Sequence, residues 1–147
     1  MKTKMAITTL VAALALAGCS MMDSMGEKMS GGGGQHVTLT GANEVPPVQT
    51  SAKGTGTVAV SSDKMVKVDL KVEGMNPTAA HIHMGAQGAN GGVIVPLEKK
   101  GDHEFVSKEG AKLTDEQYAA YKAGNTYVNV HSEAHKGGEI RAQLKGQ

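Results

Sequence analysis

Aromatic side chains are scarce in this sequence of 147 residues, which has three Tyr, one Phe and no Trp. A buried core must therefore be built from Val, Ile, Leu and Ala. The formal net charge is only +1, and no run of Lys and Arg with interleaved aromatic residues is present, which excludes a nucleic-acid interface. The length predicts one domain with short extensions. The 20 Gly residues, about twice the usual share of roughly 7%, favour turns and short strands over long helices.

Cysteine occurs once, at position 19, so the chain cannot form an internal disulfide bond. This cysteine ends a Leu-Ala-Gly-Cys tetrapeptide that follows a positively charged start and a short apolar run over residues 6–17. The run is shorter than the roughly 20 residues that a transmembrane helix needs, and it is typical of an export signal. The tetrapeptide resembles the bacterial lipobox, so we expect residues 1–18 to be a lipoprotein signal peptide and Cys19 to be lipidated. The alternative is an ordinary signal peptide with an unrelated cysteine.

Ser20 follows the predicted lipidation site. By similarity to lipoprotein sorting in Gram-negative bacteria, a serine there predicts an outer-membrane anchor with the protein facing the periplasm. We interpret residues 19–35 as a flexible tether rich in Met and Gly. Thioethers suit Cu(I), so the tether could also collect copper, but we favour a plain spacer. Its methionines are Met21, Met22, Met25 and Met29.

Alternation of apolar and polar residues begins after the tether. In residues 65–72 every second side chain is aliphatic, which predicts a strand with one buried and one solvated face. Pro96 indicates an edge strand, and Thr114 with Gln117 has the pattern of a helix capping box. The predicted strands are residues 37–40, 54–60, 65–72, 78–84, 93–97, 103–106, 126–131 and 139–144, and the one predicted helix is 113–124. This pattern predicts an all-β domain over residues 36–147, an antiparallel Greek-key sandwich or barrel.

Histidines occupy corresponding positions on two of these strands. His81 and His83 flank Ile82, so both imidazoles lie on the face opposite the aliphatic side chains. His131 likewise lies opposite Val128 and Val130 on its own strand, and His135 follows in the next loop. If the two strands are neighbours, four neutral imidazoles gather at one sheet surface: His81, His83, His131 and His135. Ligation by nitrogen alone suits Cu(II), with Zn(II) as the alternative.

Other polar residues near the second histidine strand could orient the imidazoles. We expect Asn129, Glu133 and Glu139 to hydrogen-bond to ring N–H groups around the ion. Glu139 and Arg141 also suit a structural ion pair. A blue-copper electron-transfer site is disfavoured, because that site needs a thiolate and the single cysteine lies in the predicted anchor. The exposed histidines His36 and His103 are given no role.

Several separated motifs, in this order, resemble the chordin-type (CHRD) domain family. They are Leu39-Thr40-Gly41-Ala42-Asn43-Glu44-Val45-Pro46-Pro47-Val48, Ala80-His81-Ile82-His83, Asn90-Gly91, Tyr127-Val128-Asn129-Val130-His131 and Gly138-Glu139-Ile140-Arg141. The resemblance covers residues 37–145 and implies an immunoglobulin-like or barrel-like β fold. The family is found in bacterial exported proteins and in chordin, an extracellular antagonist of growth factors. Family members commonly carry Pro where Lys136 stands, and position 135 often varies, which makes His135 the weakest of the four candidate ligands.

A looser similarity connects the chain to copper-zinc superoxide dismutase. That family also has a His-x-His strand followed by a glycine-rich, Asn-containing loop on a Greek-key barrel. Neither a bridging histidine with a separate zinc set nor a disulfide is evident here. The similarity therefore implies a copper-binding geometry more than dismutase activity.

The sequence leads us to expect a lipid-anchored periplasmic protein that binds copper for sequestration or delivery. The first alternative is a dismutase-like copper oxidoreductase, and the second is a structural or protein-interaction domain without metal. The expected partners are a metal ion and, through the anchor, a membrane. A protein partner and a homo-oligomer stay open.

Overall fold

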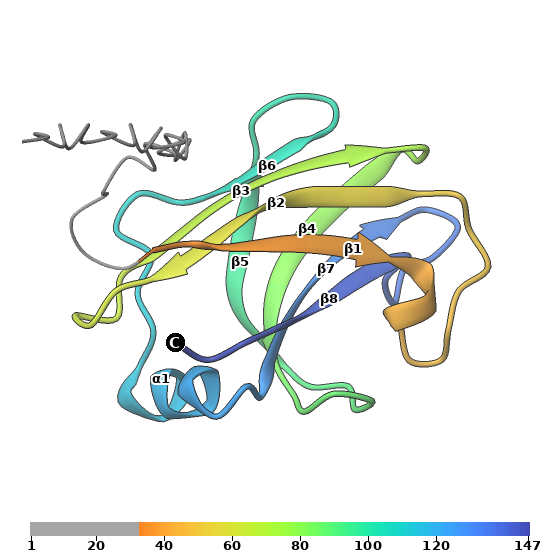
Figure 1. The fold of residues 1–147 in the computed structure, drawn as a ribbon. Coiled ribbons are helices and arrows are strands. Elements are labelled where there is room, and N and C mark those ends of the chain that lie inside the picture. Colours follow the sequence, from red (N-terminus) through yellow and green to blue (C-terminus); the bar gives the residue numbers. More distant parts are fainter. Residues whose placement is uncertain (1–32) are drawn as a thin grey trace, which may run out of the picture.

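A computed structural model describes residues 33–147 of the chain (Figure 1). The predicted signal peptide, the predicted lipidation site Cys19 and most of the predicted tether lie outside these residues. Eight strands and one α-helix make up the described part. They are β1 (Gln35–Thr40), β2 (Lys53–Val60), β3 (Val66–Glu73), β4 (Pro77–Met84), β5 (Val93–Lys99), β6 (Glu104–Ser107), α1 (Asp115–Lys122), β7 (Thr126–Ser132) and β8 (Ile140–Leu144), with a 3-10 turn η1 (Gly41–Asn43) after β1.

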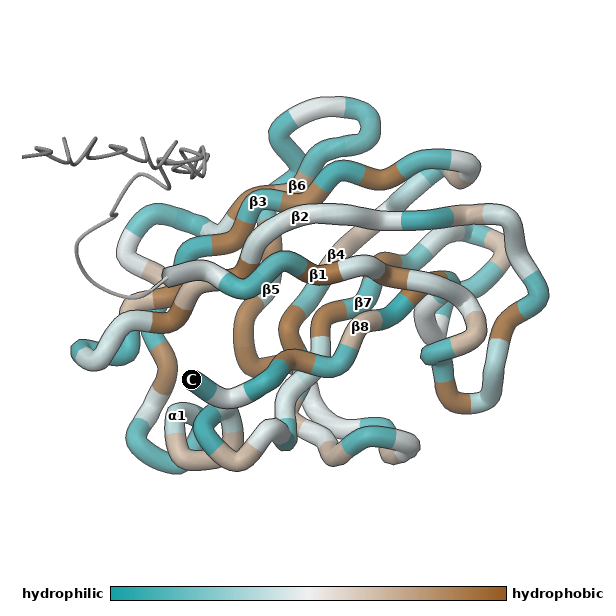
Figure 2. Tube along the Cα trace, viewed as in Figure 1, coloured by the Kyte–Doolittle hydropathy of each residue, from teal (hydrophilic) through white to brown (hydrophobic). Residues whose placement is uncertain are grey.

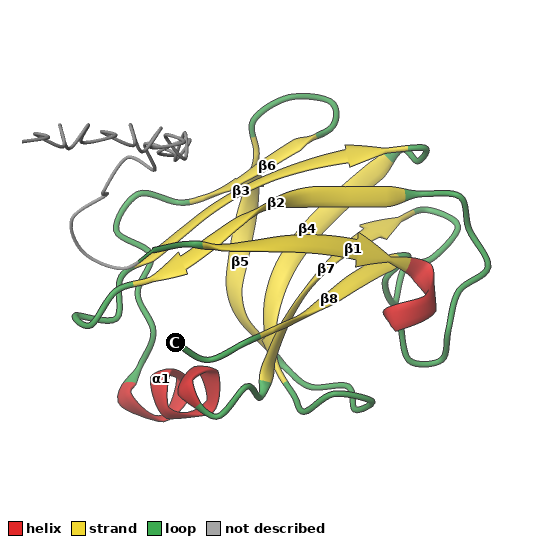
Figure 3. Ribbon diagram, in the orientation of Figure 1, coloured by secondary structure: helices red, strands yellow, loops and turns green. Residues whose placement is uncertain are grey.

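The eight strands close into a barrel in the order β1-β2-β3-β6-β5-β4-β7-β8. Every pairing is antiparallel, and β8 returns to β1 at Thr40 and Arg141. Strands β4, β5 and β6 are consecutive neighbours (Figure 3). Strand β3 pairs with β6, and β7 pairs with β4, so strands β3 to β6 and strands β4 to β7 form two overlapping Greek keys. The prediction of an all-β, antiparallel Greek-key fold with one short helix is confirmed.

Alternation along the strands fills the interior with aliphatic side chains. On β3, the aliphatic positions are buried and the Lys, Asp and Glu positions between them are exposed. The same strand pattern brings Leu39, Val58, Ile82 and Val130 into one core, in which Phe105 is one of few large rings. Figure 2 shows the apolar segments distributed over the strands around the barrel. Burial of this apolar surface, at about 25 cal/mol per Å², is the main source of stability.

The predicted capping box of α1 is present. The Gln117 backbone N–H donates to the Thr114 hydroxyl at 3.2 Å, and the Thr114 N–H donates to the Gln117 side-chain carbonyl at 2.9 Å. Tyr121 on this helix is buried, and its hydroxyl accepts from the amide of Gln35, the first residue of β1. Gln35 therefore belongs to the fold rather than to the predicted tether. In residues 33–147, no helix combines the length and apolar character that crossing a membrane requires.

The prediction that Pro96 marks an edge strand is wrong, because β5 has a neighbour on each side in the closed barrel. Pro96 lies opposite His81 of β4, whereas pairing with β6 starts only at Leu97. The proline, which has no N–H to donate, thus lies where β5 changes partner. An interrupted ladder tolerates the missing donor there.

Strand β7 is buried on both faces, unlike β3. Tyr127 and Asn129 point away from the core yet are only 2% exposed. Three loops account for this burial. Gly91 donates to the Tyr127 hydroxyl, and the Lys136 carbonyl lies against the His131 ring. The side chains of Glu44 and Asn129 both lie next to Gly138. The covered outer face of β4, β7 and β8 contains the predicted histidine site.

Candidate metal centre

Strands β4 and β7 present their histidines on the same outer surface. His81 and His83 point outward from β4, and Ile82 between them is buried in the core. In the antiparallel register, Ala79 lies opposite His131 and His81 lies opposite Asn129. His131 is therefore the diagonal neighbour of His81, a position that places long side chains within reach of each other.

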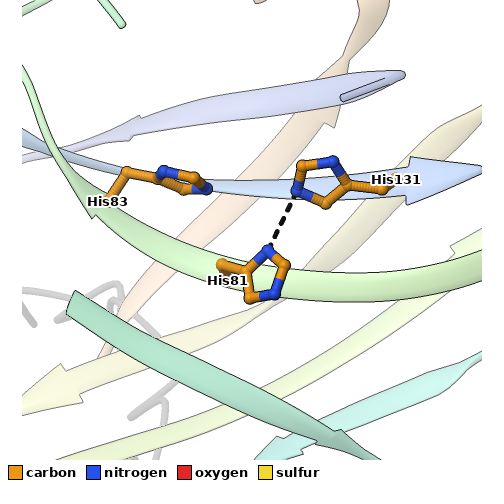
Figure 4. A group of neighbouring side chains, drawn as sticks. All are labelled: His81, His83 and His131. Atoms are coloured by element: carbon orange, nitrogen blue, oxygen red, sulfur yellow. Dashed lines mark hydrogen bonds between the residues drawn. The ribbon is translucent and has the colours of Figure 1, made fainter. Parts of the chain in front are cut away.

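The three imidazoles His81, His83 and His131 converge on one point (Figure 4). Each offers one ring nitrogen to a group whose ligand atoms all lie within 4.8 Å of one another. Nδ1 of His81 and Nε2 of His131 are 3.0 Å apart. An ion bound tetrahedrally by nitrogens at about 2.0 Å holds those nitrogens roughly 3.3 Å apart. This contact is a hydrogen bond in which Nδ1–H of His81 donates to Nε2 of His131. Closing the group around a single ion therefore needs a shift of the His81 proton to Nε2 as well as small side-chain movements.

Backbone carbonyls fix the orientation of two of these rings. Nδ1–H of His83 donates to the carbonyl oxygen of Gly91 at 2.9 Å, and Nδ1–H of His131 donates to that of Lys136 at 2.9 Å. With Nδ1 protonated, each neutral ring keeps its lone pair on Nε2. Nε2 of His83 is buried without a hydrogen-bond partner. A buried lone pair without a donor is costly, and a metal ion would satisfy it.

Burial keeps two of the three histidines, His81 and His131, in the neutral form that binds metals. It lowers the pKa of His81, and the neighbouring His131 and His83 rings lower the pKa further. Burial also lowers the pKa of His131, against the opposing effect of its hydrogen bond to the Lys136 carbonyl. Because the ordinary pKa of histidine is already about 6.5, both rings are neutral at pH 7 and can act as ligands.

A model of the CHRD domain family matches residues 36–144, which is most of the chain. The chain belongs to the CHRD domain family. The resemblance seen in the separated sequence motifs is thereby confirmed. No curated protein and no solved structure matches the chain significantly.

Of the four predicted ligands, the CHRD domain brings three together. His135 is not a member of the group. It lies in the turn after β7, where its backbone N–H donates to the Ser132 hydroxyl and its carbonyl oxygen accepts from Gly138. This turn contributes the Lys136 carbonyl oxygen to the site rather than the His135 ring.

None of the three residues expected to orient the imidazoles is hydrogen-bonded to a ring of the group. Glu133 is exposed and lies 4.0 Å from Lys136. Glu139 is buried and accepts from the hydroxyls of Thr50 and Ser132. Asn129 is buried with its Oδ1 unpartnered. Backbone carbonyls take the expected role instead, and the sequence holds no signal for them because every residue has a carbonyl.

The expected ion pair between Glu139 and Arg141 does not form. In the described part of the CHRD domain, the salt bridges are Lys64–Asp115 and Lys136–Glu133. Arg141 is 1% exposed, and its guanidinium carbon lies 3.4 Å from the centroid of the Tyr127 ring. Sequence reasoning gave Arg141 a different partner and Tyr127 no role, although the outward parity of both residues on adjacent strands could have indicated this contact.

Proposed function

We propose that this CHRD domain binds a copper ion through His81, His83 and His131, for sequestration or delivery of the metal. The observation that carries the proposal is the convergence of three imidazole nitrogens within 4.8 Å of one another. Two of the three rings are oriented by backbone carbonyls before any ion arrives, which lowers the cost of ordering the ligands on binding.

Donor chemistry favours copper over other ions. A set of nitrogen ligands suits copper and zinc, and Cu(II) binds more tightly than Zn(II) at a comparable site. Carboxylate oxygens, which Mg²⁺ and Ca²⁺ require, are missing from the three-residue group. Zinc is therefore the alternative ion.

The proposal includes the location expected from the sequence. A lipid on Cys19 would hold the domain at the outer membrane in the periplasm, with residues 20–34 as the spacer. The support for this part is the lipobox-like tetrapeptide and the serine that follows it. A copper-binding domain tethered there would retain metal ions that have entered the periplasm.

A dismutase-like copper oxidoreductase is the second candidate. Three protein ligands leave at least one coordination position open, as in catalytic metal sites, and His81 is only partly buried. A superoxide assay on the metal-loaded protein separates this candidate from a storage or delivery role. The third candidate, a metal-free interaction domain, predicts no tight binding at all.

Titration of the purified domain with Cu(II), Cu(I) and Zn(II), combined with metal analysis of protein isolated from the periplasm, tests the proposal. We expect one copper ion per chain. The matched control is the His36→Ala, His103→Ala double variant, which removes two exposed histidines and should bind like the unaltered domain. Equal affinity of a His81→Ala, His83→Ala variant and this control would contradict the proposal.

A further inference from the structure

A stack of three planar side chains lies beside the histidine group. The rings of His83 and Tyr127 are 4.8 Å apart between centroids and nearly parallel, with an interplanar angle of 1°. Arg141 lies over the Tyr127 ring, with 3.4 Å from its guanidinium carbon to the ring centroid. Because β7 lies between β4 and β8 in the barrel, the tyrosine ring lies between the imidazole and the guanidinium. All three side chains are buried.

The guanidinium of Arg141 also holds the loop of residues 85–92. One terminal nitrogen donates to the carbonyl oxygens of Ala89 at 2.7 Å and Ala86 at 3.3 Å, and the other donates to the side-chain oxygen of Asn90 at 3.2 Å. The Asn90 amide in turn donates to the carbonyl oxygen of Val45 at 2.8 Å. Arg141 therefore fixes this loop through hydrogen bonds, and among the described residues it forms no salt bridge with a carboxylate.

This loop reaches the stack again at Gly91. Its N–H donates to the Tyr127 hydroxyl at 3.1 Å, and its carbonyl oxygen accepts Nδ1–H of His83 at 2.9 Å. A Cβ at position 91 would lie 1.6 Å from the Met84 carbonyl oxygen, so only glycine lets the loop return this close to β4. Gly91 thus connects the tyrosine hydroxyl to the histidine.

We propose that Tyr127 and Arg141 are positioning residues for His83. Tyr127 holds the imidazole plane by stacking and holds Gly91 through its hydroxyl, while Arg141 holds the loop that carries Gly91. Together they keep the proton of His83 on Nδ1 and direct the bare Nε2 into the group formed with His81 and His131. The role as ligand rests on the proposed function, whereas the fixed tautomer is a property of the metal-free protein.

NMR of the metal-free, ¹⁵N-labelled domain tests the positioning role without metal. The ring ¹⁵N shifts of His83 in the unaltered domain should report a single tautomer with Nδ1 protonated. Tyr127→Leu should give a mixture of tautomers. Tyr127→Phe, which keeps the ring and loses the hydroxyl contact, should lie between the two. A folded Tyr127→Leu variant that keeps His83 fully protonated on Nδ1 would overturn the proposal.

Tyr121 supplies the matched control. It is as buried as Tyr127, at 2% exposed, and its hydroxyl is also hydrogen-bonded, but its partner is Gln35 and it lies on α1. Tyr121→Leu should lower stability and leave the His83 tautomer unchanged. If Tyr127→Leu does not fold, the His83 tautomer is measured in Tyr127→Phe and Arg141→Lys instead. Arg141→Lys keeps the charge and loses the planar fork, so an unchanged tautomer in both variants overturns the proposal.

A copper titration of the same variants gives the second readout. Loss of a group that orients a ligating histidine typically weakens metal affinity by about 10–100-fold, and we expect that range for Tyr127→Leu and no change for Tyr121→Leu. Equal copper affinity of both variants would count against positioning. If the unaltered domain binds neither copper nor zinc while its His83 tautomer still depends on Tyr127, the proposed function fails and the positioning role stands.

Discussion

The outer faces of β3 and β7 arise from the same alternating pattern and have opposite surroundings. On β3 the outward residues Lys67, Asp69 and Lys71 are exposed to solvent. On β7 the outward residues Tyr127 and Asn129 are 2% exposed. Loops cover β7 and leave β3 open, so one barrel has a plain solvated face and a second, polar layer buried outside its core. Ligand groups that are desolvated and held in place belong to that second layer.

Removing the histidines of β4 should have the largest effect in this comparison. We predict that His81→Ala with His83→Ala abolishes tight copper binding, with a loss above about 100-fold, the upper end of the effect of an outer-layer contact. The same i, i+2 change on the open face, Lys67→Ala with Asp69→Ala, should leave affinity unchanged. Isothermal titration with copper measures both, and circular dichroism should show both variants folded, because neither pair lies in the core.

The arginine of the covered face should matter more for stability than a lysine of the open face. Arg141→Ala removes the donor shared by the Ala86 and Ala89 carbonyls and the Asn90 side chain and opens a void beside Tyr127, so we predict a loss of about 2–4 kcal/mol. Lys71→Ala on β3 should change stability by less than about 0.5 kcal/mol. Denaturant unfolding followed by circular dichroism gives both values. Equal midpoints for the two variants would mean that the covered layer does not contribute to folding.

The buried carboxyl group of Glu44 gives a further difference between the covered face of β7 and the open face of β3, in the pH dependence of stability. Burial raises the pKa of Glu44, outweighing the Arg141 charge and the Asn129 amide, which lower it. A raised pKa means that Glu44 contributes stability when protonated, below about pH 4.5, and loses it as pH rises through the folded pKa. Glu44→Gln should therefore stabilise the domain at pH 7 and have a smaller effect at pH 4.

Glu73→Gln is the control for that change, since Glu73 is exposed on β3. Its effect on the unfolding midpoint should be close to zero at both pH values. A Glu44→Gln variant that is less stable than the unaltered domain at pH 7 would show that the ionised carboxylate is stabilising where it lies.

The smallest predicted effect is the pH dependence of the metal-free histidine group. The pKa values of His81 and His131 are lowered on folding, so the unfolded chain binds more protons as pH falls below about 6.5. Stability should be fully present above that pH and decrease below it. Unfolding midpoints measured from pH 8 to pH 5 should show this slope, and His81→Gln with His131→Gln should reduce it. A slope that persists unchanged in the double variant would assign it to other groups.

Strand periodicity predicted most of the barrel and the proximity of three of the four candidate ligands. It succeeded because β3 alternates strictly and the core residues Ile82 of β4 and Val128 and Val130 of β7 keep the same two-residue period. The histidines His81, His83 and His131 lie on the opposite parity. Parity gives the direction of a side chain. It does not tell whether a loop from elsewhere in the chain covers that side.

The incorrect expectations have a common cause, which is that they depend on contacts between residues far apart in the sequence. Pro96 was expected at an edge, but barrel closure depends on pairings that are not local in sequence. Arg141 was expected beside Glu139, but the loop of residues 85–92 offers its guanidinium three acceptors. The carbonyls that orient His83 and His131 come from loops whose paths are set only in the folded chain.

X-ray absorption at the copper edge, on domain loaded with one equivalent of the metal, tests the central claim most directly. The account predicts about three nitrogen ligands near 2.0 Å, with the multiple scattering of imidazole, and loss of one imidazole in His83→Ala. A spectrum dominated by sulfur or carboxylate ligands, or one that is identical in His83→Ala, would contradict it.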